Sequence, residues 1–180
     1  MRSDEGQILD TFLDTIWIEK GLSQNTLDSY KSDIEKYFLW LSKISLNYKE
    51  VSRADILQYL SYLFNQKLGS KSVARKLSSL RMFYKYLVVK NILSIDPCEK
   101  VETPKVMKSI PKTLDENEIE RLLECPDDNS SLGLRDKAMI ETLYSCGLRV
   151  SELINLELIH VNARQGVMKV LGKGQKERLV

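Results

Sequence analysis

The chain has 180 residues, with 27 Lys and Arg against 25 Asp and Glu, a net charge of +2 and 43% hydrophobic residues. This composition allows a buried core and excludes a disordered or membrane-spanning chain. Because the net charge is small, an argument for nucleic-acid binding must rest on where the charges lie. Cys98, Cys125 and Cys146 are too widely spaced for a metal knuckle. Without an export signal, these cysteines predict reduced thiols in a cytoplasmic protein, and no metal or cofactor is expected.

Residues 1–93 predict a bundle of four amphipathic helices. Apolar side chains recur at helical spacing over 8–17, 27–41, 56–64 and 73–87. Short connections between such helices favour an antiparallel arrangement. The residues expected to end or cap the helices are Gly21, Ser23, Ser52 with Asp55, Gly69 and Ser70.

The fourth helix of this bundle is strongly basic. From Lys67 to Lys90 there are seven basic residues and no acid. A helix that buries one face and offers an unpaired basic face suits contact with DNA phosphates. The alternative, a solvated basic face, is equally open at this point. The predicted DNA contacts are Lys71, Arg75, Arg81 and Lys85, together with Lys36 on the polar side of the second helix.

Residues 94–112 predict a linker between two domains. Three of the four prolines, Pro97, Pro104 and Pro111, fall in this segment, which has no sustained periodicity. The second domain, 113–180, is expected to open with a helix, because Asp115 and Glu118 have the spacing of a capping box. A further helix is expected from Leu134 towards Gly147.

Arg149 lies at the joint between two predicted helices. Gly147 suits the left-handed conformation that often ends a helix, and a new apolar run starts at Val150. An arginine here could grip a phosphate or a carboxylate, although arginines in helix turns are usually ordinary surface residues. Farther on, 165–171 and 176–180 predict two strands joined by a turn, with Lys173 between two glycines at its tip.

Taken together, these stretches resemble the tyrosine recombinase (phage integrase) family, and within it the Xer branch. The likeness covers essentially the whole chain, and the segments that carry it are Leu134-Arg-Asp-Lys-Ala-Met, Tyr144-Ser-Cys-Gly-Leu-Arg-Val-Ser-Glu-Leu and Gly172-Lys-Gly-Gln-Lys-Glu-Arg-Leu-Val. The resemblance implies a mainly α fold. An N-terminal four-helix, SAM-like core-binding bundle would precede the first part of an α+β catalytic domain with a small antiparallel β-hairpin.

The resemblance also implies a reaction and its partners. Tyrosine recombinases cut and rejoin double-stranded DNA through a tyrosine, and protein cations stabilise the transition state without a metal. By likeness, Arg149 holds the scissile phosphate, Lys173 is the general acid, and Glu152 orients Arg149 or simply pairs with it. The implied partners are a dif-like recombination site, a XerC-like partner recombinase and a DNA-translocating division ATPase.

The sequence departs from the family pattern after the predicted hairpin. The resemblance implies a nucleophilic tyrosine and a His-x-x-Arg motif there, but all eight tyrosines precede Arg149. His160 is followed by Val161, Asn162 and Ala163, so it lacks the arginine and is expected to be structural or exposed. We therefore expect a truncated recombinase that binds DNA without cutting it. A catalytically dead DNA-binding module or competitor, and a helical domain that binds acidic protein or RNA, remain alternatives.

Overall fold

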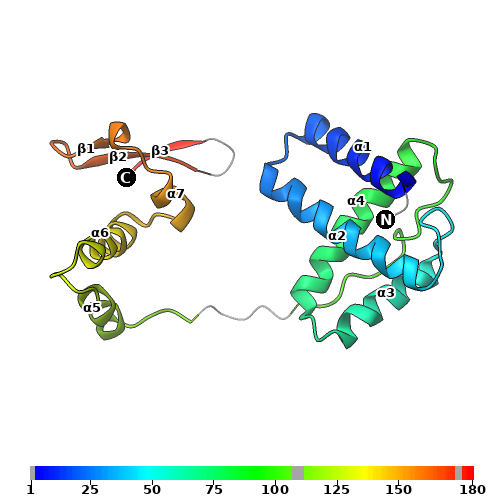
Figure 1. Ribbon diagram of the computed structural model, residues 1–180, viewed down its shortest axis with the longest axis horizontal. Coiled ribbons are helices and arrows are strands. Elements are labelled where there is room, and N and C mark those ends of the chain that lie inside the picture. The colour runs from blue at the N-terminus through cyan, green and yellow to red at the C-terminus, as the bar shows by residue number, and fades with distance from the viewer. Residues whose placement is uncertain (1–2, 107–111, 173–175) are drawn as a thin grey trace. The chain divides into compact units, whose positions relative to one another are not determined.

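The computed structural model describes residues 3–106, 112–172 and 176–180. The chain divides into two compact units, Met1–Lys108 and Ser109–Val180, which are described separately (Figure 1). Helices dominate both units, and unit 2 adds a small antiparallel sheet. The predicted fold class, mainly α with a small sheet near the carboxyl end, is confirmed.

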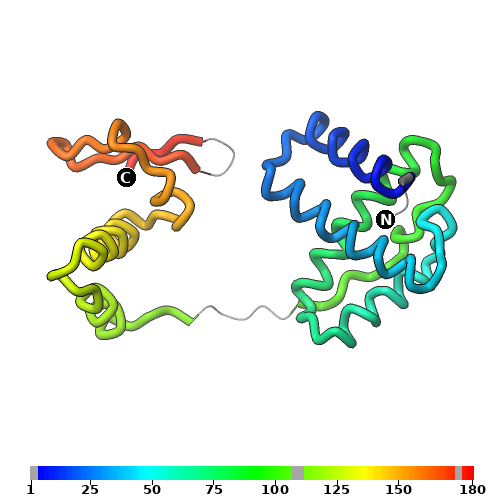
Figure 2. The backbone as a smooth tube through the Cα atoms, in the orientation of Figure 1, coloured from blue at the N-terminus to red at the C-terminus, as the bar shows by residue number. Residues whose placement is uncertain are grey.

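Unit 1 is a helical bundle in which the fourth helix, α4, contacts the other three (Figure 2). Helix α4 packs against α2 and α3, while α1 packs against α2 and also reaches α4 through the ring of Phe12. The helices follow the predicted apolar stripes closely. Their bounds are α1 Ser3–Lys20, α2 Gln24–Lys43, α3 Arg53–Asn65 and α4 Ser70–Val89.

Aromatic rings fill the centre of unit 1. Phe83 of α4 contacts Phe12 of α1 and Phe38 of α2 edge to face, with ring centroids 5.4 and 5.6 Å apart. The hydroxyl groups of Tyr37 and Tyr84 form a buried hydrogen bond of 2.8 Å. Burial raises the pKa of both phenols above the usual value of 10. Rings pack well at these separations, and the paired hydroxyls avoid an unsatisfied polar group in the core.

The helix ends agree only in part with the sequence expectations. Ser52 and Asp55 form the predicted capping box of α3, which satisfies backbone N–H groups at the helix start. Ser23 precedes α2, but its hydroxyl is hydrogen-bonded to the Thr26 hydroxyl and caps no backbone N–H. Gly69 does not end α3, which stops at Asn65, because Lys67 takes the left-handed conformation at φ 60°. Gly69 instead precedes the first residue of α4.

The first part of the predicted linker packs on unit 1. Cys98 and Val101 are buried in the same core as the helices. Arg81 of α4 donates hydrogen bonds to the Val101 carbonyl and, at 2.8 Å, to the Thr103 hydroxyl. Burial raises the pKa of the Cys98 thiol to about 12. The chain is therefore held against α4 as far as Thr103.

Unit 2 begins with helices and ends in the sheet, whose strands run in the order β1-β2-β3. Both strand pairs are antiparallel, with Val161 opposite Met168 and Val170 opposite Arg178. The two predicted strands are present, and β1 was not predicted. The apolar run after Gly147 forms only a five-residue helix, α7. The bounds are α5 Glu116–Glu124, α6 Ser131–Cys146, α7 Val150–Ile154, η1 Leu158–His160, β1 Val161–Asn162, β2 Val167–Leu171 and β3 Glu177–Leu179.

Unit 2 buries few apolar side chains. Among its described residues, Leu148 and Val170 are the only buried large hydrophobic side chains. Many others face solvent, including Leu134, Tyr144, Ile154, Leu158, Ile159, Leu171 and Leu179. In the part of the chain that the structure describes, no helix combines the length and the apolar character needed to cross a membrane.

Candidate functional site

The corner between α6 and α7 brings Arg149 to the surface. Helix α6 ends at Cys146, and Gly147 after it has the left-handed φ of 56° that glycine adopts without strain. The chain then turns, buries Leu148, and reaches Arg149 in an extended conformation immediately before α7. The Arg149 side chain is 65% exposed. This is the helix-to-helix corner that the sequence predicted.

A buried carboxylate holds this corner together. The Glu152 side chain is only 4% exposed, and one of its oxygens accepts the Arg149 backbone N–H at 2.8 Å. The other oxygen accepts a hydrogen bond of 2.7 Å from Nη1 of Arg149. Arg178, on β3, donates to both oxygens, at 2.8 and 2.9 Å. Glu152 thus joins the α6–α7 corner to the sheet and fixes the base of the Arg149 side chain.

These hydrogen bonds keep Glu152 ionised. The Arg178 side chain and the Arg149 backbone N–H are the largest contributors that lower the pKa of Glu152 to about 2. Hydrogen bonds to a carboxylate favour its charged form. Between them the three side chains carry two positive charges and one negative charge. The cluster therefore has a net positive charge at neutral pH, which suits an anionic ligand.

Lys173, the second predicted catalytic residue, lies outside the described residues. The neighbouring Gly172 is described, and its backbone N–H donates to the Lys176 carbonyl at 2.7 Å. A Cβ atom added at Gly172 would lie 3.6 Å from Nη1 of Arg178 and 3.9 Å from Oε1 of Glu152. Gly172, which follows β2, therefore lies beside the cluster that holds Arg149.

The basic face of α4 in unit 1 is partly compensated. The expectation of an unpaired face is wrong for Arg75, whose guanidinium donates to both oxygens of Asp33 on α2, at 2.6 and 2.9 Å. Lys76 also pairs with Asp33, at 2.8 Å. The reason is that the acid comes from another helix, so the sequence of α4 alone did not reveal it. Arg81 likewise donates hydrogen bonds to the segment that follows α4, to the Val101 carbonyl and the Thr103 hydroxyl.

Three of the predicted DNA contacts are free lysines. Lys71 and Lys85 on α4 and Lys36 on α2 are exposed. Within 3–106, 112–172 and 176–180, none of the three forms an ion pair. Exposed, unpaired lysines keep their full charge for an external anion.

Sequence reasoning missed Asp33, Lys76 and Arg178. Asp33 directly precedes the core residue Ile34 and is itself buried. Its partners lie 42 and 43 residues away along the chain, so the pairing itself had no local signal. Across the described ranges, no group of three or more His, Cys, Asp or Glu side chains is placed to hold a metal ion.

Two known domain families match the chain. Residues 9–91 match the phage integrase N-terminal SAM-like domain, and residues 112–180 match the phage integrase family. The chain belongs to the tyrosine recombinase (phage integrase) family. Among curated relatives, it is 47% identical to the tyrosine recombinase XerD of Pseudomonas putida over 96% of this chain and 58% of that protein. It is 42% identical to XerD of Vibrio cholerae over 98% of this chain and 58% of that protein. The chain thus spans about three fifths of the length of these recombinases.

Solved recombinase structures share the fold. A lambda integrase dimer bound to a COC′ core site has a TM-score of 0.74 at 17% identity, over 97% of this chain and 61% of that chain. The XerH site-specific recombinase bound to its difH substrate has a TM-score of 0.65 at 19% identity, over 86% of this chain and 48% of that chain. At these identities the likeness supports the recombinase fold.

Proposed function

We propose that this chain is the DNA-binding and phosphate-engaging part of a Xer-type site-specific recombinase. The observation that carries the proposal is the Arg149 corner, in which a buried carboxylate holds an exposed arginine inside a chain of the tyrosine recombinase family. The established relatives at 40–47% identity are named XerD, which supports the Xer branch. The reaction would be cleavage and rejoining of DNA strands in the cytoplasm.

Arg149 would hold the scissile phosphate. A guanidinium presents a planar fork of N–H donors that matches two non-bridging phosphate oxygens. Fixed donors of this kind stabilise the charge that develops in the transition state, and removal of one typically lowers the rate by about a hundred- to a thousandfold. By resemblance, Lys173 would protonate the departing 5′ oxygen. Glu152 would position Arg149 and carry no proton in the reaction.

We further propose that these 180 residues bind DNA without cutting it. The resemblance implies a tyrosine nucleophile and a His-x-x-Arg motif after the hairpin, and these residues are not in the sequence. A suicide substrate with a nick near the cleavage site tests this proposal. We expect a shifted complex on a native gel and no protein–DNA adduct on a denaturing gel. A covalent adduct would overturn the proposal.

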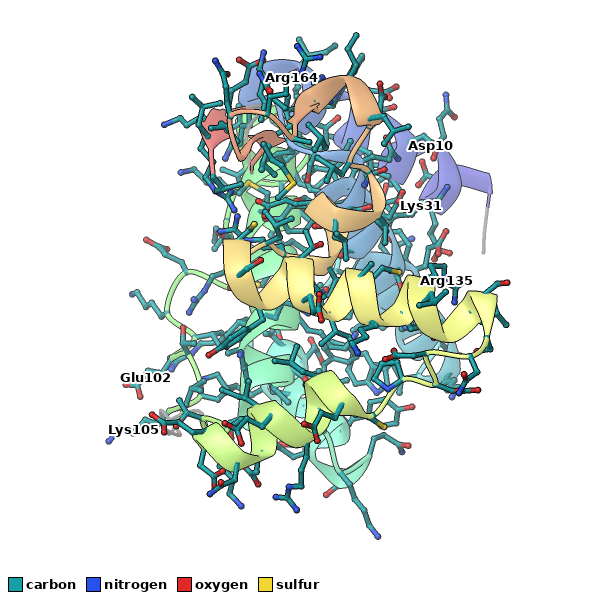
Figure 3. The ribbon with its side chains drawn as sticks, turned by 90° about the vertical axis from the view of Figure 1, so that its left-hand side faces the viewer. Asp10, Lys31, Glu102, Lys105, Arg135 and Arg164 are labelled. Atoms are coloured by element: carbon teal, nitrogen blue, oxygen red, sulfur yellow. The ribbon has the colours of Figure 1, made fainter. Side chains whose placement is uncertain are left out.

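Duplex DNA would lie against Lys36 of α2 and against Lys71, Arg75 and Lys85 of α4, all of which are exposed. Each phosphate that a protein neutralises adds about 0.9 to the slope of log affinity against log salt. We expect the variant Lys71→Ala/Lys85→Ala to reduce the magnitude of this slope by up to about the contribution of two phosphates. The matched control is Lys31→Ala/Lys49→Ala, which removes the same charge from residues that lie against α1. Figure 3 labels Lys31 and Asp10, which line the same pocket.

Fluorescence anisotropy with a short palindromic duplex at several salt concentrations provides the measurement. If the control variant flattens the slope as much as the α4 variant does, the α4 face is not the DNA contact. Binding of acidic protein or RNA in preference to the duplex would favour the helical interaction domain instead.

The partners follow from the same branch of the family. We propose a dif-like recombination site as substrate, in line with the difH substrate of the XerH structure. A XerC-like recombinase would act as partner, and a DNA-translocating division ATPase would control the reaction. Mixing the chain with a XerC protein on a dif-containing duplex, and looking for a cooperative ternary complex, tests the first two partners.

A further inference from the structure

A buried carboxylate lies beneath the basic face of α4. The Asp33 side chain is 2% exposed and comes from α2. It accepts hydrogen bonds from Nη1 and Nη2 of Arg75, at 2.6 and 2.9 Å, and from Nζ of Lys76, at 2.8 Å. The Ser79 hydroxyl adds a fourth bond, at 2.9 Å. All of these donors belong to α4, so Asp33 joins the two helices that carry the predicted DNA contacts.

The two cations bound to Asp33 differ in exposure. The Lys76 side chain is 9% exposed, so its ammonium group is buried against Asp33 and is not available to an external ligand. The Arg75 side chain is 54% exposed. Buried charges need partners of opposite sign, and Lys76 supplies that partner for Asp33. The cluster of Asp33, Arg75 and Lys76 therefore keeps a net positive charge, which it presents through Arg75.

The geometry also fixes the direction of Arg75. A carboxylate that binds both Nη atoms fixes the plane of the guanidinium, and the group has further N–H donors that these two bonds do not use. Beside it lies a shallow surface pocket of about 330 Å³, lined by Asp28, Ser29, Ser32, Asp33 and Arg75. A long side chain held in place before binding loses less conformational freedom when it binds.

We propose that Asp33 and Lys76 form a positioning pair that holds Arg75 ready to contact a DNA phosphate. This inference rests on the proposed function, DNA binding through α2 and α4. It assigns a role in binding to two side chains that do not touch the DNA. Asp33 sets the direction of the Arg75 N–H donors. Lys76 offsets the negative charge of Asp33, so the positive charge of Arg75 remains available to a phosphate.

The test must separate positioning from simple charge. Removal of Asp33 alone adds one positive charge, which by itself favours DNA binding. The double variant Asp33→Asn/Lys76→Met keeps the net charge and leaves no buried charge without a partner. It removes the charged acceptor of Arg75, so a change in affinity reports the positioning of that side chain.

Affinity for a short palindromic duplex is measured by fluorescence anisotropy at one salt concentration, with folding checked by circular dichroism. We expect the double variant to bind on the order of tenfold more weakly than the unaltered chain. In an Arg75→Ala background the same double change should alter affinity by less than about twofold, because the group that it positions is absent. Ser42→Ala, which removes no charge and only a hydroxyl of α2 that donates to the Leu39 carbonyl, is the control and should retain near-normal affinity.

The outcomes distinguish this inference from the proposed function. If the unaltered chain does not bind the duplex at low salt, the proposed function fails and the positioning role fails with it. If the chain binds but the double variant keeps its affinity, or loses it equally in the Arg75→Ala background, only the positioning role is overturned. Should the double variant fold poorly, Asp33→Glu gives a second test. It keeps the charge and shifts the carboxylate by one methylene, and unchanged affinity would overturn the positioning role.

Discussion

At the scale of single residues, the two units use the same arrangement for their exposed arginines. Glu152 holds Arg149, and Asp33 holds Arg75; the carboxylates are 4% and 2% exposed, and the arginine side chains 65% and 54%. In each case a second cation also binds the carboxylate, Arg178 in unit 2 and Lys76 in unit 1. The second cation offsets the carboxylate, so the exposed arginine retains its positive charge.

Arg178 should control the ionisation of Glu152. The folded pKa of about 2 lies below the usual 4.5, so the pairing stabilises unit 2 above pH 4.5 and this stabilisation is lost as the pH falls towards 2. We expect Arg178→Ala to raise the pKa of Glu152 towards 4.5, because its largest hydrogen-bond contribution is lost. A ¹³C NMR titration of the Glu152 carboxyl measures this shift. Arg135→Ala, which removes an exposed pair with Asp136, is the control, and an equal shift there would contradict the assignment.

Arg135 is a suitable control because it lies away from this cluster. It projects from α6, as Figure 3 shows, and its guanidinium is bonded to the adjacent Asp136. The loss of such an exposed pair typically has little effect on stability.

The buried hydroxyl pair in unit 1 gives a second prediction at this scale. The Tyr84 hydroxyl is hydrogen-bonded to the Tyr37 hydroxyl and, at 3.3 Å, to the Tyr48 carbonyl. Tyr84→Phe removes the hydroxyl and leaves the buried Tyr37 hydroxyl and Tyr48 carbonyl without this hydrogen-bond partner. We therefore expect the free energy of unfolding to fall by about 1–3 kcal/mol. Urea unfolding followed by tryptophan fluorescence measures the change. Tyr30→Phe is the control within the same unit, since the Tyr30 side chain is only partly buried and its hydroxyl bonds none of the described residues, and a similar loss there would argue against the buried pair.

At the scale of elements, two serines precede helices but do different things. The Ser52 hydroxyl takes part in a capping box at α3, whereas the Ser23 hydroxyl bonds the Thr26 hydroxyl and caps no backbone N–H of α2. We expect Ser52→Ala to lower the free energy of unfolding by about 1 kcal/mol, and Ser23→Ala to lower it clearly less. Urea denaturation of the two variants under identical conditions compares them. Equal losses would show that the hydrogen bond of the cap is not what stabilises α3.

Helix α4 shows how one element serves two purposes. Its apolar side contributes Leu77, Leu80 and Phe83 to the core, and its polar side carries the cations proposed to meet DNA. Because the core and the Asp33 bonds fix the rotation of α4 about its axis, the exposed stripe of Lys71, Arg75 and Lys85 is fixed as well.

At the scale of the whole molecule, the two units differ in how much they bury. Unit 1 has an extensive aromatic and aliphatic core, whereas the described part of unit 2 buries Leu148 and Val170 and leaves many large apolar side chains exposed. Burial of apolar surface is the main source of stability. Unit 1 should therefore be the more stable of the two.

This difference predicts unfolding in two steps. Trp17 and Trp40 are the only tryptophans, and both belong to unit 1, so tryptophan fluorescence reports that unit alone. We expect amide protection in α6, measured by hydrogen exchange in urea, to be lost at a lower urea concentration than the fluorescence signal. A single transition that coincides for both probes would show that the units unfold together.

The sequence by itself determined the helices of unit 1, the capping boxes at Ser52 and Asp115, the corner at Gly147 and the family. The helices, caps and corner depend on periodicity and on contacts between residues three or four positions apart, which are visible in a linear chain, whereas the family was indicated by the resemblance of three motif segments. It also placed Arg149 at an exposed joint. The expected role of Gly69 was wrong because α3 already stops at Asn65, before a left-handed Lys67. That of Ser23 was wrong because its hydroxyl bonds the Thr26 hydroxyl and no backbone N–H.

Only the tertiary structure decided which charges pair between different helices and strands. Asp33 meets Arg75 across 42 residues, and Glu152 meets Arg178 across 26. A pairing over such distances depends on how two helices, or a helix and a sheet, pack against each other, and side-chain spacing along one element does not encode it. The basic face of α4 consequently looked unpaired in the sequence, and the structure showed that its central arginine is held by a buried acid.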